Sequence, residues 1–136
     1  MKITAIVLNI ALFLFTCMVL VTDGPPQEAS YIVFAVWSQL TLILTPVAIS
    51  LLWPGSGWIR NVRTKDLMLF AAIILNIVNL GFVCWALVDQ YPHPDEEGFI
   101  EYAVLLVLVP IVSLVVLYRG RPVGGLLDIF LKRKMV

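Results

Sequence analysis

Long apolar stretches separated by short polar segments dominate the chain. The stretches cover about residues 3–22, 30–53, 66–88 and 99–118. A helix of about 20 residues crosses a hydrocarbon core of roughly 30 Å, and each stretch reaches that length. Helix-breaking glycines and prolines lie in the first two connections, as Gly24-Pro25-Pro26 and Pro54-Gly55-Ser56-Gly57. The pattern therefore predicts four transmembrane helices.

The short connections predict how these helices are arranged. Consecutive helices joined by short loops lie antiparallel beside each other. We therefore predict an all-α integral membrane protein: an up-down four-helix transmembrane bundle that forms a single domain over residues 1–136. We detect no repeat between the two halves of the chain and no low-complexity tract.

The tail over residues 121–136 has a different pattern. Apolar residues recur at helical spacing from Leu126 to Leu131, and a basic run follows them. A short C-terminal amphipathic basic segment of this kind can lie on the anionic inner leaflet. An ordinary positive end to the last span explains the pattern equally well.

The charged residues are strongly segregated along the chain. All nine Lys and Arg residues lie at the N-terminus, in the second connection or after the fourth stretch. The first and third connections hold acidic residues and no Lys or Arg. By the positive-inside rule, both termini and the second connection should be cytoplasmic. Besides Lys2, the basic residues expected at the inner leaflet are Arg60, Arg63, Lys65, Arg119, Arg121, Lys132, Arg133 and Lys134.

Composition supports membrane insertion and excludes one class of partner. The chain is 61% hydrophobic and 13% charged, so it has more apolar surface than a soluble domain of this size can bury. The surplus should face lipid, and the bilayer is the first expected partner. The net charge of zero argues against a nucleic-acid partner. The compactness of the chain suggests a bacterial plasma membrane.

Cysteine and histidine give little support for redox or metal chemistry. Cys17 and Cys84 lie inside apolar stretches without a Cys-x-x-Cys motif, so we interpret them as small apolar residues. A disulfide between them is the alternative. His93 lies among carboxylates in the third connection, but without a familiar ligand spacing. We interpret that connection as a solvated acidic loop and expect no metal and no cofactor.

The spans contain uncharged polar residues and, away from their ends, no ionisable ones. Proton-coupled transporters usually keep an ionisable group at membrane depth, so this activity loses support. Small and amide side chains also let transmembrane helices pack closely. We expect one set of residues to pack the bundle interior or, alternatively, to line a path for a solute. They are Asn9, Thr41, Thr45, Asn76, Asn79 and Pro110.

Two prolines inside the spans suggest a specific contact. Pro110 removes the backbone hydrogen bond to the carbonyl of Leu106, and Pro46 does the same for Leu42. Freed carbonyls at membrane depth need hydrogen-bond donors. We hypothesise that Asn76 or Asn79 donates to one of these carbonyls.

Gln39 is separate from the other polar residues of its span. It lies about 100° around the helix from Ser38, on a side that also holds Ala35 and Ser50. A glutamine that faces lipid is costly, so this side could meet another protein or a second copy of the chain. A local bond from Gln39 to the backbone one turn earlier is equally consistent.

The chain shows no arrangement of residues that is typical of catalysis. It lacks a plausible Ser–His–Asp grouping and a glycine-rich phosphate loop. Our first hypothesis is a non-catalytic membrane protein that acts through helix contacts with another membrane protein, as an accessory subunit or an immunity or regulatory protein. The alternatives are a homo-oligomeric channel or carrier for a small neutral solute, and a lipid-modifying enzyme that uses the basic face.

Overall fold

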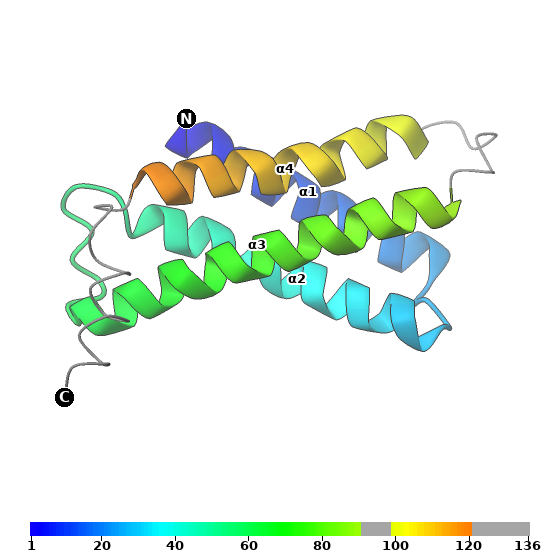
Figure 1. The fold of residues 1–136 in the computed structure, drawn as a ribbon, viewed down its shortest axis with the longest axis horizontal. Helices are drawn as coiled ribbons and strands as arrows, with labels where there is room; N and C mark the ends of the chain where they lie inside the picture. The colour runs from blue at the N-terminus through cyan, green and yellow to red at the C-terminus, as the bar shows by residue number, and fades with distance from the viewer. Residues whose placement is uncertain (91–98, 121–136) are drawn as a thin grey trace, which may run out of the picture.

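The computed structural model describes residues 1–90 and 99–120. Four helices run alternately in opposite directions: α1 (Lys2–Asp23), α2 (Ala29–Ser50), α3 (Val62–Gln90) and α4 (Phe99–Arg119). They pack side by side in an up-down bundle (Figure 1). Each contains a segment long and apolar enough to cross a membrane. The predicted fold class is therefore confirmed, whereas the predicted amphipathic tail lies outside the described residues.

The second connection differs from the prediction at both of its ends. Helix α2 ends at Ser50 because the chain turns, with the Leu52 and Trp53 amides donating to the carbonyls of Ile49 and Ser50, both at 3.1 Å. Helix α3 begins at Val62, earlier than predicted. The Asn61 side chain accepts a hydrogen bond from the Arg63 amide at 3.0 Å and so caps the first turn.

Two clusters of buried apolar residues form the core. The first cluster lies toward the end of the bundle that holds the N-terminus and the α2–α3 connection (Figure 1). It consists of Ala5, Ala48, Ile49, Leu69, Ala72, Val116 and Leu117. The second cluster is centred on Leu12, Leu42 and Val109. Across the bundle, α2 contacts α4, whereas α1 and α3 share no contact among the described residues.

The two halves of the chain are similar, so the prediction of no repeat is wrong. Aligning Asn9 with Asn76 places residues 3–23 on residues 70–90, and nine of the 21 aligned positions are identical. The identical pairs are Ala5/Ala72, Ile6/Ile73, Leu8/Leu75, Asn9/Asn76, Ile10/Ile77, Phe15/Phe82, Cys17/Cys84, Leu20/Leu87 and Val21/Val88. Aligning Thr45 with Ser113 places residues 31–50 on 99–118, with six of 20 positions identical. The two connections inside the halves differ in sequence, which hides the repeat.

Burial follows the same repeat. Most buried positions of the first half have a buried counterpart in the second half. These pairs are Ala5/Ala72, Asn9/Asn76, Leu12/Asn79, Thr16/Val83, Thr41/Val109, Leu42/Pro110, Thr45/Ser113, Ala48/Val116 and Ile49/Leu117. The bundle therefore consists of two hairpins of similar sequence and burial, α1–α2 and α3–α4, although α1 packs less extensively against α4 than α2 packs against α3.

Candidate functional site

Four uncharged polar side chains, one from each helix, lie at the same level of the bundle. They are Asn9, Thr45, Asn76 and Ser113, and all four are buried. Each lies about one helical turn from a member of the first cluster, and Asn9, Thr45 and Ser113 also lie about one turn from a member of the second. These four residues, which we call the polar layer, therefore lie between the first and the second cluster.

The two asparagines of the polar layer make equivalent hydrogen bonds. Asn9 Nδ2 donates to Ser113 Oγ at 2.8 Å and to the Ala5 carbonyl at 2.7 Å. Asn76 Nδ2 donates to Thr45 Oγ1 at 2.7 Å and to the Ala72 carbonyl at 2.8 Å. One bond of each amide links two helices, α1 to α4 and α3 to α2. Both pairs follow the sequence repeat.

The oxygen of each of these amides has no hydrogen-bond partner. Asn9 Oδ1 and Asn76 Oδ1 are both buried and unpaired. The orientation of the amides is fixed, because the carbonyls of Ala5 and Ala72 only accept and therefore require the nitrogen on their side. An unpaired buried acceptor costs about 1–3 kcal/mol. The polar layer therefore contains two unused acceptors at membrane depth.

A second set of bonds joins α2 to α3 nearer the other end of the bundle. Ser38 Oγ donates to Asn79 Oδ1 at 3.0 Å, and Trp37 Nε1 donates to the Leu75 carbonyl at 3.1 Å. Thr41 Oγ1 donates within its own helix, to the Trp37 carbonyl at 2.9 Å. The Ser38 and Trp37 bonds hold α2 against α3, and Asn79 is the one residue of the predicted polar set that takes part in them.

The hypothesis about the carbonyls freed by proline is wrong for Asn76. Both protons of its amide are already used, in the bonds to Thr45 and Ala72. Asn79 is joined to α2 through its oxygen, so a bond from its nitrogen to the Leu42 or Leu106 carbonyl stays a prediction. Pro110 itself is buried inside α4.

The predicted partner face on α2 is only partly exposed. Gln39, Ala35 and Ser50 are all half-buried, and Ser50 Oγ donates to the Val47 carbonyl at 2.7 Å. Gln39 Nε2 is buried and has no partner, so it forms no local backbone bond. Because the chain itself covers this nitrogen, Gln39 does not present it on the outer surface. A partner contact at this face stays a prediction.

The described basic residues gather at one end of the bundle. Arg60, Arg63 and Arg119 are exposed and Lys65 is half-buried. They lie just before or in the first turn of α3 and at the end of α4, which share one end of the bundle (Figure 1). Lys2 Nζ donates to the Leu52 carbonyl at 2.7 Å, which ties the start of α1 to the turn after α2. The other predicted inner-leaflet residues, Arg121, Lys132, Arg133 and Lys134, lie outside the described residues.

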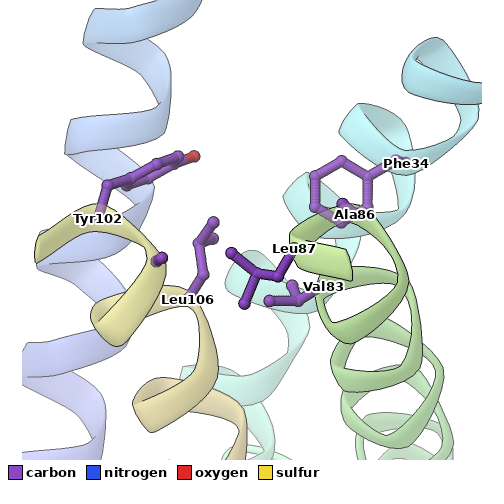
Figure 2. Close-up of a pocket in the computed structure, with 7 residues that line it drawn as sticks. Phe34, Val83, Ala86, Leu87, Tyr102 and Leu106 are labelled. Carbon is purple, nitrogen blue, oxygen red and sulfur yellow. The ribbon is translucent and has the colours of Figure 1, made fainter. Parts of the chain in front are cut away.

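An apolar pocket of about 140 Å³ lies near the other end of the bundle. Figure 2 shows Tyr102 and Leu106 of α4 on one side of it, opposite Val83 and Leu87 of α3, with Phe34 of α2 behind them. The remaining lining residues are Ala86 and Ala103. Since this lining is apolar apart from the tyrosine hydroxyl, the pocket offers space for an apolar group.

A larger and more open groove of about 440 Å³ has Gly81 of α3 in its lining. Ser30, Val78, Phe82 and Trp85 complete the lining. Apart from its two chain neighbours and the nearby backbone of its own helix, no described atom lies within 4 Å of the place where a Cβ atom of Gly81 would be. The aligned position in the first half is Leu14, so only the second half carries a glycine here. The sequence analysis missed this groove, and the Leu14/Gly81 difference between the repeats is the signal that could have revealed it.

The described residues contain no grouping of His, Cys, Asp and Glu that could hold a metal ion. Cys17 and Cys84 are both free, so the alternative of a disulfide between them is wrong. The physical reason is that α1 and α3 lie at opposite corners of the bundle without contact. His93 and its acidic neighbours lie outside the described residues.

Comparison with known proteins assigns no family to the chain. No protein-family model matches it, and no curated protein sequence or solved structure shows significant similarity to it. The molecule is an integral membrane protein with four candidate spans.

Proposed function

We propose that this protein is a non-catalytic accessory or regulatory subunit that binds a transmembrane helix of another membrane protein. The observation that carries the proposal is the groove at Gly81, which opens on the outside of the bundle between α2 and α3. An apolar groove within membrane-spanning helices can accept side chains of a neighbouring helix. The groove is thus the proposed partner site.

The glycine itself supports a contact between helices. Glycine in a helix interior costs about 1 kcal/mol relative to alanine. In membranes, small residues recur where two helices approach closely, because packing rather than the hydrophobic effect drives association. Leu14 at the aligned position of α1 is exposed, so a large side chain is compatible with this kind of hairpin. The packing of the chain itself therefore does not require a glycine at position 81.

The walls of the groove are fixed by bonds inside the bundle. Ser38 bonds to Asn79 and Trp37 bonds to the Leu75 carbonyl, and both bonds hold α2 against α3. A groove that exists before the partner arrives needs less ordering when the complex forms. Phe82 and Trp85 add aromatic surface, and Trp85 is 51% exposed. Aromatic anchors of this kind are common in protein interfaces.

The charge distribution supports an orientation in the membrane. Lys2, Arg60, Arg63, Lys65 and Arg119 belong to the end of the bundle that holds the N-terminus (Figure 1). The opposite ends of α1, α2 and α3 carry acidic residues, at positions 23, 28 and 89. Basic residues accumulate on the cytoplasmic side. The proposal therefore includes a cytoplasmic basic end, in a bacterial plasma membrane.

Gly81→Leu should abolish capture of the partner. The added side chain would fill the groove as Leu14 fills the aligned surface of α1, so at least a tenfold loss of co-purifying partner is expected. The measurement is mild detergent extraction of the tagged full chain from its native membrane, followed by quantitative mass spectrometry of the proteins bound to it.

Ala11→Leu is the matched control for this experiment. Ala11 is an exposed residue of α1 aligned with Val78, so this change enlarges a lipid-facing side chain away from the groove. It should leave partner capture unchanged. If Gly81→Leu retains every partner that the unmodified chain captures, or if the unmodified chain captures none, the proposal is wrong.

Reporter fusions test the proposed orientation. A reporter that is active only in the cytoplasm should work when inserted at Ser56, in the α2–α3 connection, and when fused after Val136. The same reporter inserted at Gln27, between α1 and α2, should be inactive. Reporter activity at Gln27 alone would show that the acidic end is cytoplasmic and that the proposed orientation is wrong.

The two alternative functions have less support from the geometry. A solute path through one chain would have to cross the first cluster, in which buried apolar residues of all four helices close one side of the polar layer. Solute flux into liposomes that falls on Asn76→Leu would nevertheless favour a channel. A lipid-modifying enzyme would use the arginines of the basic end, which the proposed orientation already explains.

A further inference from the structure

We infer that the polar layer binds two small neutral hydrogen-bond donors of the size of water, one at Asn9 Oδ1 and one at Asn76 Oδ1. Both side chains are almost completely buried, at 0% and 1% exposure, and both oxygens lack a partner. This site is independent of the groove at Gly81, which lies on the outside of the bundle.

The repetition of the arrangement supports the inference. Each amide donates to the carbonyl four residues earlier in its own helix and to a hydroxyl of a neighbouring helix. Each is thereby held with its oxygen turned away from these two acceptors. The same unpaired oxygen in both halves of the chain indicates a shared property of the two hairpins rather than a local irregularity.

The chemistry of the layer defines the class of ligand. An amide oxygen accepts a hydrogen bond, so its partner must be a donor. The four side chains of the layer carry no charge, and nothing in the layer would balance the charge of a cation. The first cluster lies on one side of the layer with residues of all four helices, and the second lies on the other side with residues of α1, α2 and α4, which disfavours an extended polar molecule. A small neutral donor such as water fits these requirements.

A further polar group and small side chains lie near the layer. A buried water typically makes two to four hydrogen bonds. Pro46 frees the carbonyl of Leu42, which lies one turn from Thr45 on α2 and can accept the second proton of a water at Asn76. The side chains that border the layer one turn away on α1, α2 and α3 are the small ones of Ala5, Ala48 and Ala72.

Water-edited solid-state NMR on the full chain in bilayers tests this inference. With the chain uniformly labelled with ¹⁵N, magnetisation should pass from water to the side-chain amides of Asn9 and Asn76 within milliseconds. Asn61, exposed in the connection before α3, is the positive control. The backbone amide of Ala48, buried in the first cluster, is the negative control and should receive little magnetisation.

Two results would overturn the inference. If the side-chain amides of Asn9 and Asn76 receive no more magnetisation than the backbone amide of Ala48, the layer binds no water. If the backbone amides of Ala48 and of the second cluster receive as much magnetisation from water as the layer does, water fills the interior continuously instead of occupying two separate sites. Asn9→Leu should remove one site and leave the transfer to Asn76 unchanged, and the measurement on the unmodified chain stands even if this variant does not fold.

Discussion

Asn76→Asp should lower the free energy of unfolding by about 3 kcal/mol. The aspartate has the shape of asparagine but replaces the donor of two bonds by a second oxygen. That oxygen would face the Ala72 carbonyl and Thr45, where the asparagine nitrogen now donates at 2.8 and 2.7 Å. A carboxylate in the middle of a transmembrane helix costs about 2.5–3.5 kcal/mol on insertion scales. The measurement is reversible unfolding in mixed micelles, followed by circular dichroism.

Two companion variants separate the causes of this loss. Asn61→Asp makes the same chemical change at an exposed position and should alter the free energy of unfolding little. Asn76→Leu removes the donor together with the unpaired oxygen, so its loss should be clearly smaller than that of Asn76→Asp. Equal losses for the Leu and Asp variants would contradict the role given to the buried amide nitrogen.

Ala72→Leu should destabilise the bundle by about 2 kcal/mol, and Ala5→Leu by a similar amount. Both alanines are fully buried in the first cluster, at aligned positions of the two halves. Extra methylene groups in a close-packed interior typically cost about 1–3 kcal/mol. In a membrane bundle they also separate helices that small residues let approach. Unfolding in mixed micelles measures both variants.

Ala11→Leu serves as the control for overpacking. Ala11 lies on α1 and is exposed, so the same enlargement faces lipid and should change stability by less than about 0.5 kcal/mol. If Ala72→Leu were as well tolerated as Ala11→Leu, the first cluster would not be packed as the structure shows. If Ala5→Leu alone were tolerated, the two halves would differ in packing despite their similar sequences.

The class of fold could be predicted because the membrane imposes it. Apolar stretches of span length with short connections leave few arrangements other than an up-down bundle. The ends of α2 and α3 were less predictable, because they depend on local bonds at Leu52 and Asn61 rather than on hydrophobicity. The start of α3 at Val62 lies in a polar stretch that a hydrophobicity pattern assigns to a loop.

The polar residues were partly predictable. Their spacing within each span placed Asn9, Thr45 and Asn76 on helix faces that could meet. Their pairing depends on how one helix is shifted along another, which a pattern within one helix does not contain. The groove at Gly81 was not predicted, because a glycine inside a span becomes informative only through comparison with Leu14 and through the empty space beside it.

The relation between the two hairpins has a consequence for stoichiometry. If two identical hairpins formed the bundle as a symmetric dimer, every substitution would appear in both of them. Such a dimer would therefore offer two identical docking surfaces. In the joined chain each hairpin can vary alone, and leucine and glycine now occupy the equivalent places in α1 and α3. Within the described residues the groove at Gly81 has no counterpart at Leu14, so the proposed function implies one partner helix for each chain, in a one-to-one complex.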